Sequence, residues 1–208
     1  MSRDPFDIPV SRKPLHFFWV VDTSGSMSVD GKIQTLNTAV REALPHMRAA
    51  AAENPEAEVI VHVLQFSDSA CWVGEPEGVD KFGWEDLTAG GLTAMGDALG
   101  KLADQLKMPP MPQRGLPPVL VLVSGGPPTD DFAHGLRKLN SQPWAGKAVR
   151  LAIPIGKNAD VGVLRQFTGP EYPVLAPSGA EQLIGFIRWA STEPERSCRP
   201  GSDPGGRH

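Results

Sequence analysis

Three oxygen-bearing side chains alternate in one short segment near the N-terminus. Asp22, Ser24 and Ser26 stand two residues apart in the segment VVDTSGSMS, with Gly25 between the serines. In an extended loop, residues two apart point the same way, so these oxygens can converge on one point, and Gly25 lets the backbone turn tightly. A hard cation such as Mg²⁺ prefers oxygen ligands, and neutral hydroxyls leave it short of negative charge. The spacing therefore indicates a cation site that can attract one more carboxylate.

A second loop offers another hydroxyl group. Thr93 lies in the segment AGGLTAMGDAL, just before a stretch that reads as a helix. Simpler interpretations of both loops remain open, because Asp and Ser also favour hydrogen-bonded turns and helix entries. On that interpretation Gly90 and Gly91 form an ordinary turn, and Thr93 caps the helix that follows.

The elements around these loops predict an α/β fold. Residues 15–21 form an apolar run of strand length, which is typical of a central strand in a parallel sheet. The pattern of the remaining chain predicts strands at 58–66, 70–73, 119–123 and 148–155. It predicts a helix entered through Gly31-Lys32-Ile33 and ended by Asn54-Pro55, with a kink or break at Pro45, and further helices at 93–106, 130–139, 160–167 and 179–191. Strands that alternate with helices predict a Rossmann-like, doubly wound, mostly parallel sheet flanked by helices. Ligands of such sheets bind outside the carboxyl ends of the strands, where the Asp22 loop must lie.

Composition narrows the class of partner and the compartment. Lys and Arg number 20 against 24 Asp and Glu, with no basic block, so we expect neither nucleic acid nor a membrane surface as partner. The N-terminal residues carry no apolar signal region, and the apolar runs are too short to span a bilayer. Cys71 and Cys198 are far apart in sequence, which favours free thiols in a reducing compartment. We therefore expect a cytoplasmic protein with a flexible arm at 1–14, one domain at 15–191 and a disordered tail at 192–208.

Several motifs of the chain resemble those of the von Willebrand factor A (vWA) domains. The D-x-S-x-S segment is followed by IQTLNTAV, and GGLTAMGDAL, PTDD and FIRWAS occur further along. The resemblance covers about residues 15–191 and is closest to the bacterial TerY-like group, which is linked with tellurium resistance and stress signalling. It implies the vWA fold and a metal-ion-dependent adhesion site (MIDAS). By that resemblance Ser24, Ser26 and Thr93 are direct metal ligands, while Asp22 binds directly or through water and orients the serine hydroxyls.

One position departs from the vWA pattern. After the strand that corresponds to VLVLV here, the family usually has a T-D-G-x-P-T-D pattern. This chain reads S-G-G-P-P-T-D, with Gly125 in the place of the aspartate. Because cation affinity rises with the charge of the ligands, we expect weak binding of Mg²⁺, or of Mn²⁺ or Ca²⁺. The site could fill when a partner supplies its carboxylate, or the loop could work without metal. Asp130 or Asp131 could also reach across to compensate.

These observations favour a non-catalytic binding or scaffold module. The resemblance implies a protein partner that supplies an acidic residue, in a bacterial stress or signalling system. In the TerY-like group the domain is often encoded near a Ser/Thr protein kinase and a PP2C-type phosphatase, which makes these the expected partners. One alternative is a metal-free interaction domain with a degenerate MIDAS. Another is a metal-dependent phosphohydrolase with Asp22 as nucleophile, for which the chain lacks an aspartate two positions on and an evident general acid.

Overall fold

A mostly parallel sheet forms the centre of the molecule. In the computed structural model of the protein, residues 12–176 are described. Four strands run parallel in the order β2-β1-β5-β6, and two short strands lie antiparallel to β2. Their bounds are β1 (Lys13–Asp22), β2 (Ala57–Phe66), β3 (Ala70–Trp72), β4 (Glu77–Gly78), β5 (Val119–Ser124) and β6 (Val149–Pro154). The predicted α/β class and the mostly parallel sheet are confirmed.

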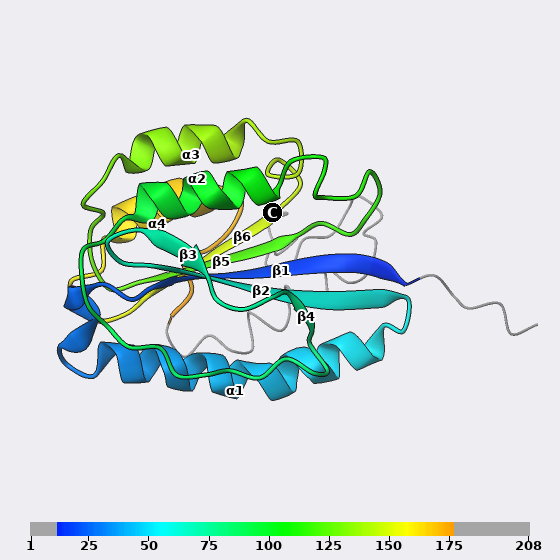
Figure 1. Ribbon diagram of the computed structural model, residues 1–208, viewed down its shortest axis with the longest axis horizontal. Helices are drawn as coiled ribbons and strands as arrows, with labels where there is room; N and C mark the ends of the chain where they lie inside the picture. The colour runs from blue at the N-terminus through cyan, green and yellow to red at the C-terminus, as the bar shows by residue number, and fades with distance from the viewer. Residues whose placement is uncertain (1–11, 177–208) are drawn as a thin grey trace, which may run out of the picture.

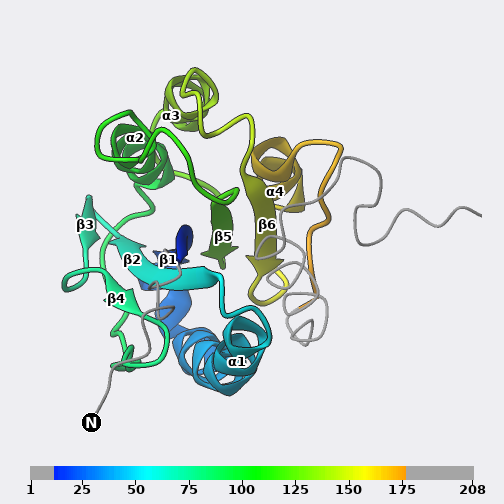
Figure 2. The same ribbon diagram turned by 90° about the vertical axis from the view of Figure 1, so that its right-hand side faces the viewer.

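Helices cover both faces of this sheet (Figures 1 and 2). The long helix α1 lies on one face, and three shorter helices lie on the other. Their bounds are α1 (Lys32–Glu53), α2 (Met95–Gln105), α3 (Phe132–Asn140) and α4 (Val161–Thr168), with a 3-10 turn η1 (Gly25–Ser28) before α1. Each face buries its own apolar cluster, which is the layered arrangement of a doubly wound domain.

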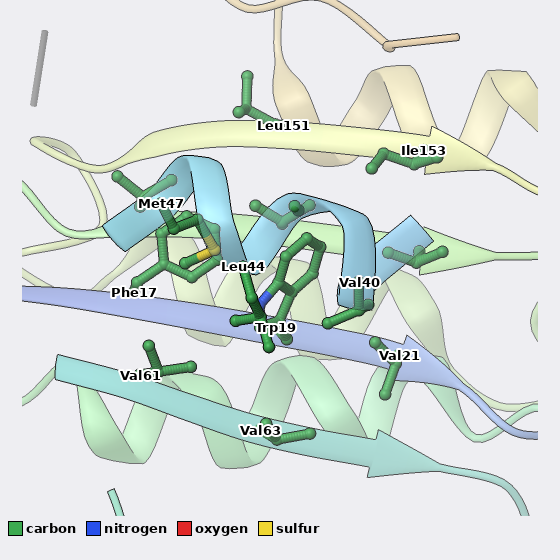
Figure 3. Close-up of a cluster of buried hydrophobic side chains, with 14 of the residues drawn as sticks. Phe17, Trp19, Val21, Val40, Leu44, Met47, Val61, Val63, Leu151 and Ile153 are labelled. Atoms are coloured by element: carbon green, nitrogen blue, oxygen red, sulfur yellow. The ribbon is translucent and has the colours of Figure 1, made fainter. Parts of the chain in front are cut away.

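The alternation of side chains along β1 supplies both of these clusters. Phe17, Trp19 and Val21 pack on the face beneath α1, as Figure 3 shows, whereas Phe18 and Val20 pack on the face beneath α2. All five side chains are buried. Because both faces are covered, the strand is apolar at every one of these positions, and this is the run that identified it in the sequence.

The interruption expected at Pro45 does not become a break. Helix α1 continues through Pro45 as one element of 22 residues. Leu44 and Met47, on either side of the proline, are buried against the sheet, while Pro45 itself faces solvent. The apolar stripe along α1 therefore holds the two halves together where the proline removes a backbone hydrogen bond.

The boundaries of the predicted segments differ in places from those observed. Lys13 and Pro14 were placed in a flexible arm but pair with Ala57 and Glu58 as the first residues of β1. The parallel register simply continues two residues beyond the apolar run, because backbone pairing does not require apolar side chains. Residues 1–11, the predicted helix at 179–191, the tail at 192–208 and Cys198 lie outside the described residues.

Strand β1 lies at the point where the order of strands reverses. The chain passes from β1 through α1 to β2 on one side, and later reaches β5 on the other side. In open α/β sheets, ligands bind outside the carboxyl ends of the strands at such a switch point. Asp22 ends β1 and Ser124 ends β5, so both lie at this edge, which is on the left in Figure 1. Between residues 12 and 176, no helix is both long and apolar enough to cross a membrane.

Candidate metal-binding site

The Asp22 carboxylate is buried and fixed by three hydrogen bonds. Its Oδ1 accepts from the backbone N–H of Ser24 at 2.8 Å. Its Oδ2 accepts from the Ser124 hydroxyl at 2.7 Å and from the N–H of Gly125 at 3.1 Å. With no exposed surface, Asp22 acts first as the anchor of the loop that carries the serines. Through the bond of Oδ1 to the Ser24 N–H, the carboxylate orients the segment that carries the serine hydroxyls.

The two serine hydroxyls point toward each other. Ser24 Oγ lies 3.0 Å from Ser26 Oγ, and within the described chain neither hydroxyl has another hydrogen-bond partner. Two oxygens bound at right angles to one Mg²⁺ at about 2.1 Å would lie about 3.0 Å apart. The pair therefore has the separation of two adjacent ligands in an octahedral shell, and the alternation seen in the sequence does bring these oxygens together.

Backbone hydrogen bonds join the first loop to the second. The N–H of Gly25 donates to the carbonyl of Gly91 at 2.8 Å, and the N–H of Gly90 donates to the carbonyl of Thr23 at 2.8 Å. Gly91 has a φ of 80°, a conformation that L side chains rarely adopt. The glycine pair thus lets the second loop lie against the serine loop, and Thr93 follows it two residues later.

Thr93 is buried, yet its hydroxyl makes no hydrogen bond to any described residue. Its backbone pairs with Thr129, because Thr93 N–H donates to the Thr129 hydroxyl and Thr129 N–H donates to the Thr93 carbonyl, both at 3.0 Å. The Thr93 hydroxyl itself has no hydrogen-bond partner among residues 12–176. Ala94, and not Thr93, is the N-cap of α2, and the Thr93 side chain makes no capping hydrogen bond to that helix. The capping role considered for Thr93 is therefore wrong, and its role as a metal ligand stays a prediction.

The third loop, which follows β5 and begins with Gly125 and Gly126, has no room for the aspartate that vWA domains usually carry there. A Cβ added at Gly125 would lie 2.4 Å from the Met27 sulfur and 3.3 Å from Cδ of Lys32. At Gly126 a Cβ would lie 3.1 Å from Ser26 Oγ, which shows how closely this loop covers the serines. Neighbouring side chains thus fill the space beside Gly125, and an aspartate would not fit there without displacing them.

Neither of the two nearby aspartates compensates for Gly125. Asp130 accepts from the N–H groups of Gly96 and Asp97, both at 2.8 Å, at the start of α2. Asp131 is the N-cap of α3 and accepts from the N–H of His134 at 2.9 Å. Both carboxylates satisfy free N–H groups of helix starts, where negative charge is also favoured by the helix dipole. Asp22 is left as the carboxylate of the candidate site.

Sequence reasoning missed three residues that organise this edge. Ser124 bonds Asp22, Thr129 bonds the backbone of Thr93, and Lys32 reaches the carbonyl of Gly125 from the start of α1. Ser124 was detectable as the one polar residue that closes an apolar strand. Thr129 and Lys32 carried no such signal, because each acts across a contact between loops that are far apart in sequence.

A histidine pair occupies the face of the sheet beneath α2, toward the start of β1. His16 Nδ1 and His62 Nε2 lie 2.9 Å apart, and the His62 ring stacks on Phe18. Burial first, and the neighbouring His16 second, lower the pKa of His62 to about 3. Burial also lowers the pKa of His16. His62 is thus a hydrogen-bonded residue of β2.

Comparisons with known proteins identify the fold. No protein-family model and no curated protein matches the chain. The ArnB paralog VWA2 from Sulfolobus acidocaldarius is 18% identical with a TM-score of 0.58, over 84% of this chain and 45% of that one. Proximal thread matrix protein 1 from the mussel byssus, solved with a zinc occupied MIDAS motif, is 17% identical with a TM-score of 0.56, over 88% of this chain and 46% of that one.

An aerotolerance-related membrane protein from Bacteroides fragilis NCTC 9343 is 10% identical with a TM-score of 0.58, over 85% of this chain and 98% of that one. This chain spans about half the length of the first two proteins, so their similarity concerns one part of each. At these identities the comparisons establish the fold alone. The chain has the Rossmann-like fold of the von Willebrand factor A domains.

Proposed function

We propose that this chain is a non-catalytic protein-binding module that grips an acidic side chain of a partner through a divalent cation. The cation would be held by Ser24, Ser26 and Thr93 and supported by Asp22. The observation that carries the proposal is the 3.0 Å approach of two serine hydroxyls that make no other hydrogen bond among residues 12–176. The bound cation supplies a positive charge that a partner's carboxylate can complete, since these hydroxyls leave it short of anionic ligands.

The burial of Asp22 supports a binding role over a catalytic one. A nucleophilic carboxylate must present a free oxygen to its substrate, whereas the Asp22 side chain is fully buried and accepts three hydrogen bonds from the protein. The same bonds hold the serine loop rigid before any ligand arrives. Rigid placement of ligands is what a binding site needs, because less conformational entropy is lost on association.

Apolar side chains at the same edge support a protein as the partner. Val29 is 50% exposed and Leu92 is 60% exposed, and each lies in a loop that carries candidate ligands. Val161, at the start of α4, is 37% exposed. Exposed apolar residues around a polar centre are typical of protein contact surfaces, where they bury area that a single ion contact does not supply.

The cellular setting of the proposal comes from the resemblance to the TerY-like group. On that basis the domain works in the bacterial cytoplasm, in a stress or signalling system of the tellurium-resistance type. A Ser/Thr protein kinase and a PP2C-type phosphatase are the partners it proposes. Mg²⁺ is the proposed ion, and Mn²⁺ or Ca²⁺ could replace it.

The test is capture of partner proteins under controlled metal conditions. The tagged chain is incubated with cell extract, or with the purified kinase and phosphatase, in Mg²⁺ or in EDTA. We expect capture in Mg²⁺, and its loss in EDTA and in Ser24→Ala or Ser26→Ala. Ser28→Ala is the matched control, because the Ser28 hydroxyl bonds only the Gly25 carbonyl in the same exposed loop. Unchanged capture by Ser24→Ala would refute the proposed site.

A metal-free interaction domain is the second candidate. It is favoured by the hydrogen bonds of Asp22, which satisfy the buried carboxylate without any cation. The two candidates differ in their response to ions alone, because a ligand that binds only the folded state raises the melting temperature. Absence of heat or thermal shift at millimolar Mg²⁺, Mn²⁺ and Ca²⁺, with capture intact in EDTA, would establish the metal-free alternative.

A further inference from the structure

Lys32 is a buried lysine behind the candidate site. Its residue is 3% exposed, and its Nζ donates to the carbonyl of Gly125 at 3.1 Å. Within the part of the chain that the structure describes, no carboxylate lies within ion-pair distance of this ammonium. Burial of an ammonium is costly unless polar groups or an opposite charge compensate it. The position of Lys32 is therefore a feature that requires an explanation.

Two glycines leave the space through which the lysine stem passes. Gly156, with a φ of 77°, would place a Cβ 2.6 Å from Lys32 Cε, and a Cβ at Gly125 would lie 3.3 Å from Cδ. Both glycines belong to loops at the carboxyl ends of neighbouring strands β5 and β6. A side chain at Gly156 would collide with the stem and one at Gly125 would crowd it, so the loops direct the ammonium to the Gly125 carbonyl.

One residue separates this ammonium from the Asp22 carboxylate. The N–H of Gly125 donates to Asp22 Oδ2, and the carbonyl of Gly125 accepts from Lys32 Nζ, each over 3.1 Å. The buried negative charge and the buried positive charge thus lie on two sides of the same residue. Away from bulk water, the attraction between such charges is screened less than at the surface. Asp22 and Lys32 together carry no net charge.

We infer that Lys32 sets the charge of the candidate site and opposes its occupation by a divalent cation until an anionic ligand binds with the cation. This inference rests on the proposed function. A divalent cation adds two positive charges beside one carboxylate that Lys32 already balances. A carboxylate from the partner removes part of that excess. Cation and carboxylate therefore strengthen each other's binding by the same factor, as linkage requires.

The experiment measures Mn²⁺ binding by titration calorimetry or by electron paramagnetic resonance. Lys32→Met keeps a long unbranched stem and removes the charge, and Lys32→Gln also keeps a donor for the Gly125 carbonyl. We expect either variant to bind Mn²⁺ alone roughly tenfold more tightly than the wild type. The reason is that the two charges of Mn²⁺ would no longer be repelled by the single charge of Lys32 across a partly hydrated distance. Acetate, compared with chloride at equal ionic strength, should tighten Mn²⁺ binding more in the wild type than in the variants.

The controls separate a charge effect from damage to the fold. Lys157→Met removes an exposed lysine from the neighbouring loop and should leave Mn²⁺ affinity within about twofold, since exposed charges are well screened. Circular dichroism confirms folding of each variant. Ser24→Ala added to Lys32→Met should abolish the gained binding, which places the ion at the candidate site.

The results overturn the inference in either of two ways. Folded Lys32→Met and Lys32→Gln with the Mn²⁺ affinity of the wild type, or with no Mn²⁺ binding at all, would show that the ammonium does not oppose the ion. If both variants fail to fold, the wild type still tests the inference. A wild-type affinity for Mn²⁺ that acetate does not raise would also overturn the inference. Failure of the proposed function is a separate result, because it is read from unchanged capture of partners by Ser24→Ala.

Discussion

The Ser124 hydroxyl donates a 2.7 Å hydrogen bond to Oδ2 of Asp22 across two neighbouring strands. Ser124 is the last residue of β5 and Asp22 the last of β1, which are paired in parallel at the centre of the sheet. Both side chains are buried, so this bond to a charged group forms away from competing water. It ties the serine loop to the third loop and fixes the carboxylate on which the candidate site depends.

Substitution of Ser124 by alanine should therefore destabilise the domain and weaken the site. Asp22 Oδ2 would retain only the Gly125 N–H, and loss of a buried bond to a charge costs about 1–3 kcal/mol. Urea unfolding measures the loss of stability, and titration with Mn²⁺ measures the site. Ser28→Ala, in an exposed turn, should change neither quantity. A Ser124→Ala protein with wild-type stability would show that this bond does not fix the carboxylate.

Thr93→Val distinguishes a ligand from a structural hydroxyl. Because the Thr93 hydroxyl has no partner within residues 12–176, its replacement by a methyl group of similar size should leave the free energy of unfolding nearly unchanged. Capture of a partner in Mg²⁺ should nevertheless be lost. Thr23→Val is the comparison, since the Thr23 hydroxyl bonds the Phe66 carbonyl at 3.2 Å and its loss should cost about 1 kcal/mol. If Thr93→Val keeps its Mg²⁺-dependent capture, Thr93 is not a ligand.

Gly125→Ala should destabilise the third loop through a clash with Met27. The added methyl group would meet the Met27 sulfur at 2.4 Å in a fully buried position, and overpacking of this kind costs about 1–3 kcal/mol. Met27→Ala should cost less stability in the Gly125→Ala background than in the wild type, and a double-mutant cycle in urea measures that coupling. Gly90→Ala, where a Cβ meets nothing within 4 Å, is the control. Additive effects of the two substitutions would argue against the clash.

The histidine pair should make the domain less stable in mild acid. The pKa of His62 is about 3 in the folded protein against the ordinary value of 6.5, so between these values the unfolded chain binds more protons. Its contribution to stability is complete above pH 6.5 and is lost as the pH falls, by about 2 kcal/mol at pH 5.

The measurement compares urea midpoints at pH 7 and pH 5. His62→Phe, which suits the aromatic neighbours Phe18 and Trp72, should show a smaller decrease between the two pH values. The exposed His46→Gln should decrease as the wild type does. An equal decrease in His62→Phe and wild type would assign the acid sensitivity to other groups.

The sequence by itself determined the sheet and the serine loop. The apolar run of β1 identified a strand covered on both faces, because burial on two sides leaves no position for a polar residue. The hydroxyls of Ser24 and Ser26 meet as their two-residue spacing predicted, although Ser26 lies in the 3-10 turn η1 and not in an extended loop. Both conclusions depend on neighbours along the chain, and a sequence displays such neighbours directly.

Only the tertiary structure decided how the loops act on one another. The bonds of Asp130 to the start of α2, the bond of Ser124 to Asp22 and the burial of Lys32 beside Gly125 all join segments far apart in the chain. Nothing in local composition encodes which of several polar residues will meet, because that depends on strand order and on the space that glycines leave. The charge of the candidate site is thus a property of the folded loops together.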